Sequence, residues 1–113
     1  MSKRDMELYI NDILDSASAI KNYVHEMDFH QFLADRKTYS ATIREYIVIG
    51  EAVSRLIDVL EEKKPNYPWR MVKDFRNFII HEYFGVDGKI IWDLTTKELD
   101  ELIENIKSLK DCK

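Results

Sequence analysis

The segment best equipped for chemistry is residues 76–83, where four polar side chains of different kinds surround an apolar triplet. These side chains are Arg76, Asn77, His81 and Tyr83. An imidazole has an ordinary pKa of about 6.5 and can transfer protons near neutral pH. A guanidinium stays charged and forks onto phosphate oxygens. The segment therefore has the residue types needed for proton transfer and anion binding.

Helical spacing sorts these side chains onto different faces. Asn77 and His81 are four residues apart and share one face, whereas Arg76 and Tyr83 are seven apart and share another. Arg76 and His81 lie about 140° apart on an ideal helix, so one helix separates them unless it ends or distorts near His81. A structural interpretation stays open. In it, Arg76 pairs with a surface carboxylate, His81 is a half-buried polar residue near a helix end, and Tyr83 packs through its ring.

The two other histidines, His25 and His30, give little support to a metal site. Their spacing of five residues lacks the i,i+4 geometry of a helical zinc pair, and no carboxylate or cysteine stands at a usual ligand spacing from them. We expect both to be ordinary surface or loop residues. The sequence predicts neither a metal nor a cofactor.

The composition indicates one all-α domain over residues 1–113. Apolar residues make up 45% and charged residues 34% of the chain, which suits a globular domain. Only 3 Gly and 2 Pro leave few places for tight turns, which argues against an all-β fold. The single Cys112 allows no internal disulfide or CxxC pair, and no segment resembles a signal peptide or a membrane span. We expect a cytoplasmic protein without membrane contact.

The charge is unevenly distributed along the chain. The formal net charge is −4, yet residues 63–76 carry five basic groups against one acidic group, a local net charge of +4. Local patches decide which partners a protein attracts more than the overall sum does. The overall acidity therefore does not exclude a nucleic-acid partner.

The hydrophobic periodicity predicts an antiparallel, up-and-down bundle of four to five helices. The expected helices cover residues 3–27, then 28–34 with an Asp28 cap and Gln31, and then a stretch from 35 or 38 to 62. A fourth begins at Pro68, and a fifth opens with a capping box at Thr95 and Glu98. The expected buried stripe of the fourth helix consists of Trp69, Val72, Phe75, Phe78 and Ile79.

Gly50 lies in the middle of the third expected helix. A glycine there costs roughly 1 kcal/mol relative to alanine. Its presence indicates that another backbone comes close, as at a helix crossing.

The motif Arg76-Asn77-xxx-His81-x-Tyr83 resembles the R-N-x-x-x-H-x-Y motif of the HEPN superfamily, specifically of HepT-like toxins. The likeness in order and spacing extends over nearly the whole chain, through Ile49-Gly50-Glu51-Ala52, Pro68-Trp69 and the stretch from Glu82 to Trp92. Proteins of this family are homodimeric helical bundles that act as metal-independent endoribonucleases. They pair with a minimal nucleotidyltransferase antitoxin.

The resemblance implies RNA cleavage by the substrate's own 2′-hydroxyl. Such cleavage needs a base, an acid and cationic stabilisation of the phosphorane. On this implication His81 transfers protons, Arg76 stabilises the phosphorane, and Asn77 orients His81 or donates to a phosphate oxygen. Each motif has one histidine, so a base and an acid together point to two motifs facing across a two-fold axis.

The resemblance also implies a regulatory role for Tyr83. In HepT-like families the partner modifies the motif tyrosine with AMP, and phosphate on Tyr83 would add negative charge on the face of Arg76 and block the RNA site. An alternative from another class stays open, namely a non-catalytic HEPN subunit that binds a nucleotidyltransferase or a nucleotide as a regulatory scaffold. The presence of both Arg76 and His81 favours a catalytic protein over this scaffold.

Overall fold

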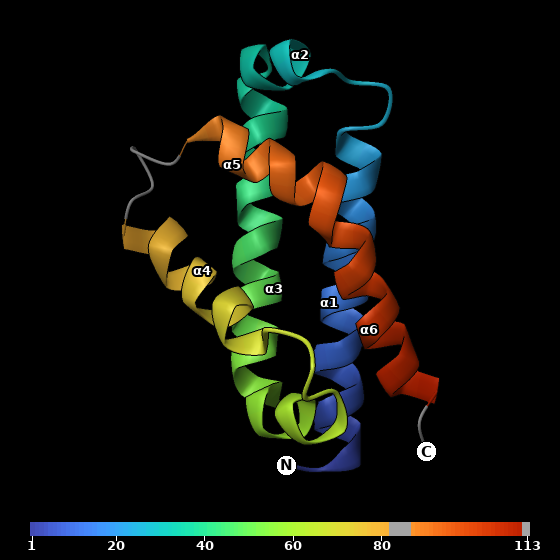
Figure 1. The fold of residues 1–113 in the computed structure, drawn as a ribbon. Coiled ribbons are helices and arrows are strands. Elements are labelled where there is room, and N and C mark those ends of the chain that lie inside the picture. The colour runs from blue at the N-terminus through green and yellow to red at the C-terminus, as the bar shows by residue number, and fades with distance from the viewer. Residues whose placement is uncertain (82–86, 112–113) are drawn as a thin grey trace.

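The computed structural model is an all-α bundle, which confirms the predicted fold class (Figure 1). It describes residues 1–81 and 87–111, with the backbone alone for residues 80, 81 and 111. The elements are α1 (Lys3–Tyr23), α2 (Phe29–Ala34), α3 (Arg36–Lys63), α4 (Trp69–His81), α5 (Gly88–Asp93), the π-helical segment η2 (Leu94–Glu98) and α6 (Leu99–Asp111). Within the described ranges there is no β-strand, and no helix is both long and apolar enough to cross a membrane.

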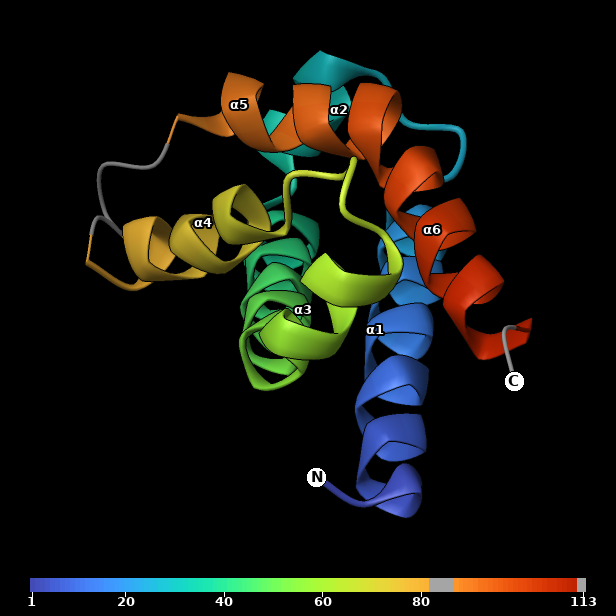
Figure 2. The ribbon, with the colours of Figure 1, turned by 60° about the horizontal axis from the view of Figure 1, so that its bottom comes forward.

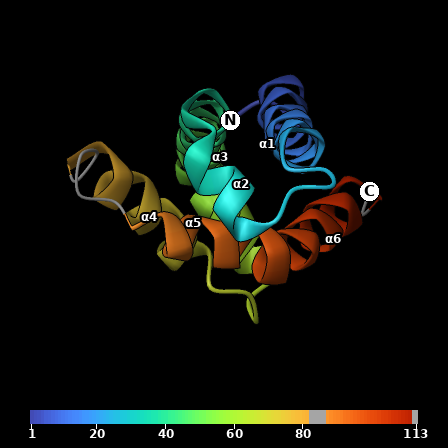
Figure 3. The same ribbon diagram turned by 90° about the horizontal axis from the view of Figure 1, so that it is seen from above.

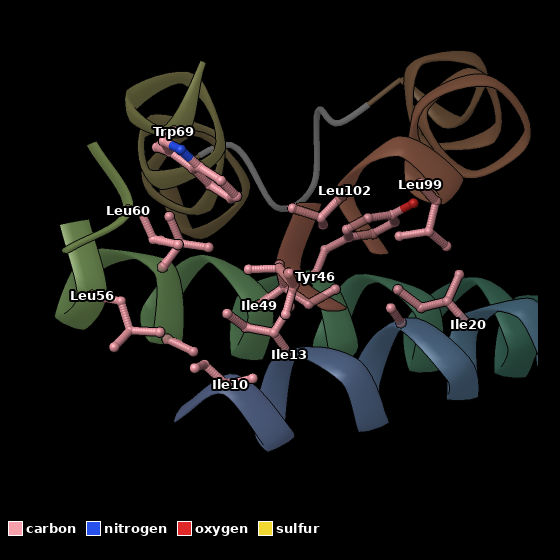
Figure 4. Packing of buried hydrophobic residues seen from close by; sticks show 14 of the residues in the cluster. Ile10, Ile13, Ile20, Tyr46, Ile49, Leu56, Leu60, Trp69, Leu99 and Leu102 are labelled. Atoms are coloured by element: carbon pink, nitrogen blue, oxygen red, sulfur yellow. The ribbon is translucent and has the colours of Figure 1, made fainter. Parts of the chain in front are cut away.

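Helices α1 and α3 form the centre of the bundle and run antiparallel, with α6 packed against α1 (Figure 3). Ile13 and Ile20 of α1 are buried in this core, and Ile13 lies beside Ile49 of α3 (Figure 4). Leu99 and Leu102 of α6 close the core from the other side. Each such side chain stabilises the fold by about 1.5–3 kcal/mol when it is fully buried, so this core holds α3 as a rigid platform.

The first three helices start at side-chain caps, and the sequence predicted the cap of the second. The side chain of Asp28 accepts from the backbone N–H of Gln31 at 2.8 Å, and the Gln31 side chain accepts from the Asp28 N–H at 2.9 Å. This capping box confirms the prediction for residues 28–34.

Helix α1 ends at Tyr23, earlier than the expected residue 27. Glu26 has a φ of 62°, a left-handed conformation that a right-handed helix does not accommodate.

The predicted capping box at Thr95 and Glu98 is wrong. Thr95 lies inside η2, where its buried hydroxyl donates to the Ile91 carbonyl at 2.9 Å and lies 2.7 Å from the Tyr46 hydroxyl. The cap is instead Asp87, whose side chain accepts from the Lys89 N–H at 2.9 Å and starts α5 at Gly88. A threonine that hydrogen-bonds within the core does not start a helix.

Helix α4 leaves the bundle on the side away from α1 and α6 and packs mainly on α3 (Figure 2). Trp69 anchors its first turn, because its ring is buried and its Nε1–H donates to the Lys64 carbonyl at 2.9 Å. The expected buried stripe is wrong at Phe78, whose side chain is 41% exposed. Among the described elements, α4 packs mainly on α3, and no other described helix covers that residue. The helix that carries the motif therefore has an uncovered face.

Candidate active site

Arg76 lies where α4 crosses α3, at the position of Gly50. A Cβ added to Gly50 would lie 2.4 Å from the Arg76 Cβ and 3.0 Å from its Cγ. Such distances are too short for any real side chain, so only glycine lets the two helices come this close. The sequence-based expectation of a helix crossing at Gly50 is confirmed, and the residue on the other helix is the motif arginine.

The guanidinium of Arg76 is held by groups on both helices. Its Nη1 forms an ion pair with the Glu51 carboxylate of α3, and its Nη2 donates to Asn77 Oδ1 at 2.8 Å. The other Glu51 oxygen, Oε1, accepts from Arg55 Nε at 3.3 Å. The Arg76 Nε is buried and has no hydrogen-bond partner in the part of the chain that the structure describes. The pairing with a carboxylate that the structural interpretation proposed for Arg76 is thus present.

Within this cluster of described side chains, positive charge stays in excess. Glu51 contributes −1 and the two arginines contribute +2, so the cluster of Glu51, Arg55 and Arg76 has a net charge of +1. The Arg76 side chain keeps 28% of its surface exposed. A fixed and partly exposed guanidinium with excess positive charge can bind a phosphate.

Of the other motif residues, Asn77 and His81 belong to α4. His81 is the last residue of that helix, and its side chain is not among those described. The backbone is helical from residue 76 to residue 81, so the spacing of about 140° between Arg76 and His81 applies to it. Tyr83 lies outside the described residues. The exposed Asn77 is adjacent to Arg76 and hydrogen-bonded to it.

The remaining histidines are peripheral to this cluster. His25 is exposed, with its Nε2 at 3.6 Å from a Glu26 carboxylate oxygen, and His30 is an exposed residue of α2 beside the Phe29 ring. Their description as surface or loop residues is confirmed. Among the described side chains, no group of three or more His, Cys, Asp or Glu gathers where it could hold a metal ion.

The basic stretch of residues 63–76 does not form one free patch. Arg70 donates from Nε and Nη2 to the two oxygens of Glu61, at 3.1 and 2.9 Å. Lys64 donates to the Ser108 hydroxyl. Arg70 and Arg76 are therefore both tied to carboxylates of α3, one near its C-terminal end and one at the crossing.

One exposed strip along α4 is apolar. Met71 is 70% exposed and Phe78 41% exposed, and the half-buried Phe75 stacks on Phe78 with ring centroids 6.1 Å apart. We call these three residues the open face of α4. Two of them, Met71 and Phe75, also line a mainly apolar cavity of about 340 Å³ between α3, α4 and α6.

Two tyrosines line this cavity and stay protonated at neutral pH. Burial raises the pKa of Tyr67 to about 12. Burial also raises the pKa of Tyr46 far above its ordinary value. Neither phenol can act there as a base.

Sequence comparison agrees with the motif and the fold. A model of the family "Ribonuclease HepT-like" matches residues 13–109. The chain belongs to the HepT-like ribonuclease family. The match includes the Gly50 crossing, the Glu51–Arg76 pair and the motif helix, so it covers the whole candidate site.

Relatives of this HepT-like chain cover it almost end to end. A protein of Methanocaldococcus jannaschii named "Putative RNase" is 38% identical over 95% of this chain and 94% of its own length. A protein of Thermococcus cleftensis named "Probable ribonuclease HepT" is 32% identical over 96% of this chain and 98% of its own length. No solved structure gives a significant match. The predicted family and the enzyme class, a ribonuclease, are confirmed.

The stretch Ile49-Gly50-Glu51-Ala52 was part of the family likeness, but neither Glu51 nor Arg55 was expected to be a site residue. Gly50 was the available signal, since a glycine in a helix interior marks a close approach of another element. The residues that follow it on the same helix are the ones placed to contact that element.

Proposed function

We propose that this HepT-like chain cleaves RNA without a metal ion, with Arg76 and His81 as its catalytic residues. A base removes the proton of the substrate's 2′-hydroxyl, the oxygen attacks phosphorus, and the bond from phosphorus to the 5′-oxygen breaks. The leaving oxygen takes a proton from an acid, which yields a 2′,3′-cyclic phosphate and a 5′-hydroxyl. His81 serves these proton transfers, and Asn77 supports the site.

The observation that carries the proposal is the state of the Arg76 guanidinium. The stem of the Arg76 side chain packs against Gly50, and its guanidinium binds the Glu51 carboxylate and the Asn77 amide. The side chain is partly exposed, and the cluster of Glu51, Arg55 and Arg76 has a net charge of +1. Donors that are fixed before the reaction stabilise a developing phosphorane without reorganisation. This is the role proposed for Arg76.

We further propose that the working unit is a homodimer with both motif helices at its interface. Each α4 offers one motif histidine, and the helical spacing sets it about 140° from the arginine of the same chain. The exposed Met71 and Phe78 support an interface on α4, because large apolar side chains are commonly covered by a partner. A second copy would then supply the missing proton-transfer group.

We propose in addition that the protein is the toxin of a toxin–antitoxin pair and that its partner silences it by transferring AMP to Tyr83. The support is the motif spacing, which puts Tyr83 seven residues after Arg76. The added phosphate would pair with a guanidinium and occupy the place of the RNA phosphate. Tyr83→Phe keeps the ring, so the variant should resist modification and inhibition. Complete inhibition of this unmodified variant by the partner would contradict the proposal.

The test of catalysis uses RNA cleavage in EDTA. Arg76→Ala and His81→Ala should each lower the rate by about 10²-fold or more, the usual scale for a charge-stabilising or acid–base group. Arg70→Ala is the matched control, because it removes an arginine of the same helix that is paired with a different carboxylate of α3. Wild-type protein that binds RNA but leaves it intact would favour the non-catalytic scaffold. Activity that disappears in EDTA and returns with magnesium would reject this mechanism.

A further inference from the structure

We propose that Glu51 is a positioning residue for Arg76: it fixes the direction of the guanidinium for the phosphate, and Arg55 compensates its charge. This inference rests on the proposed function and adds to it a residue of α3, outside the motif. It assigns Glu51 no contact with the substrate.

Two consecutive residues of α3 hold Arg76 at both ends of its side chain. Gly50 admits the arginine stem, with the Arg76 Cβ 2.4 Å from where a Gly50 Cβ would stand. Glu51 then binds the head through its Oε2 and Nη1. A side chain fixed at stem and head has few rotamers left, so its guanidinium points in one direction.

The two oxygens of Glu51 serve two different arginines. Oε2 accepts a hydrogen bond from Nη1 of Arg76. Oε1 accepts one from Nε of Arg55, which lies one turn further along α3. Since Arg55 brings its own positive charge, Glu51 does not neutralise Arg76. The cluster stays at +1, and a phosphate still meets an attractive site.

Hydrogen-bond donors also remain for a phosphate. A guanidinium has five N–H groups. One is taken by Glu51, one by Asn77, and the Nε–H is buried. Among the described residues, this leaves one N–H on each terminal nitrogen without a partner, the pair that can fork onto two phosphate oxygens.

The chain offers a closely matched control in Glu61. Glu51 and Glu61 are both glutamates of α3 that pair with an arginine of α4, and their side chains are 42% and 41% exposed. Arg76 is less exposed than Arg70, 28% against 65%, but both ion pairs join the same two helices at the protein surface, where such pairs contribute little to stability. A difference in activity between variants at the two positions would therefore not reflect the general loss of a salt bridge between α3 and α4.

The experiment compares Glu51→Gln with Glu61→Gln in EDTA, measuring kcat on RNA and the dissociation constant of a non-cleavable 2′-O-methyl RNA. Glutamine keeps the size of glutamate but has one acceptor oxygen, so at position 51 it can hold only one of the two arginines. We expect Glu51→Gln to lower kcat by about 10- to 100-fold, the scale of a misplacement near 1 Å. Its RNA affinity should stay equal or increase, because a negative charge has been removed. Glu61→Gln should change neither quantity, and both variants should unfold at similar denaturant concentrations.

A second background separates positioning from a general effect on the fold. Arg76→Lys retains the positive charge but loses the two parallel N–H groups of the guanidinium. In this variant Glu51→Gln should lower kcat much less than in the wild type, because the effects of substitutions at residues that act as a unit are not additive. Equal kcat for Glu51→Gln and Glu61→Gln, or a full additional loss in Arg76→Lys, would overturn the inference while wild-type cleavage in EDTA stands. Wild-type protein that does not cleave in EDTA would overturn the proposed function and this inference with it.

Discussion

Replacing Gly50 with alanine should strongly lower the rate of RNA cleavage and only slightly lower the free energy of unfolding. The new methyl group would lie 2.4 Å from the Arg76 Cβ, whereas ordinary contact begins at 3.4 Å. Helix α4 must therefore move by about 1 Å at the crossing, which moves the stem of the proposed catalytic arginine. Overpacking costs about 1–3 kcal/mol, and alanine in place of glycine in a helix returns about 1 kcal/mol. The free energy of unfolding should thus fall by roughly 0–2 kcal/mol.

The loss of activity should be much larger, because a displacement of 1 Å in a reacting group can reduce a rate by about 10²-fold. Urea unfolding and RNA cleavage in EDTA measure the two effects on one preparation. Gly50→Val is the graded companion and should reduce both quantities further. An alanine variant that is more stable than the wild type and equally active would refute the close contact between Gly50 and Arg76.

Three other variants test separate parts of the account. Phe78→Asp charges the open face of α4, so sedimentation at micromolar concentration should show a shift from dimer to monomer with loss of cleavage; a wild-type monomer with full activity would contradict the shared cleft. Tyr46→Phe removes the hydroxyl beside Thr95 and should cost about 1 kcal/mol in urea unfolding without changing kcat, and an unchanged unfolding midpoint would count against that hydrogen bond. The backbone N–H of Thr38 and its hydroxyl lower the pKa of Asp35 below its ordinary 3.8, so the stabilisation from the charged cap is present above pH 3.8 and is lost as the pH falls below it. Asp35→Asn keeps a capping oxygen, and the stability difference between wild type and this variant should be constant above that pH and change below it; a difference independent of pH would contradict the lowered pKa.

A local signal in the sequence was sufficient for the start of α2. Asp28 and Gln31 form a capping box within one turn, so their spacing alone identifies the start of α2. Thr95 and Glu98 have the same pattern but do not cap a helix, because the Thr95 hydroxyl binds Ile91 and Tyr46 inside the core. Tertiary hydrogen bonds of this kind are not visible in a local pattern.

The candidate site was predictable only in part. The motif spacing identified Arg76 and its neighbours on one helix, and Gly50 indicated a crossing. The partner in that crossing could not be predicted, because Glu51 and Arg76 are 25 residues apart and meet only when α3 and α4 pack. Likewise, the exposure of Phe78 follows from α4 packing mainly on α3 among the described elements, which periodicity does not reveal.

The chemical ends of the products test the central claim most directly. A defined RNA is incubated in EDTA with the wild-type protein, and both fragments are analysed by mass spectrometry. Attack by the 2′-hydroxyl predicts a 2′,3′-cyclic phosphate on one fragment and a 5′-hydroxyl on the other, and a single 2′-deoxy substitution at the cleaved position should abolish the cut. A 5′-phosphate and a 3′-hydroxyl, formed only after magnesium is added, would contradict catalysis by Arg76 and His81.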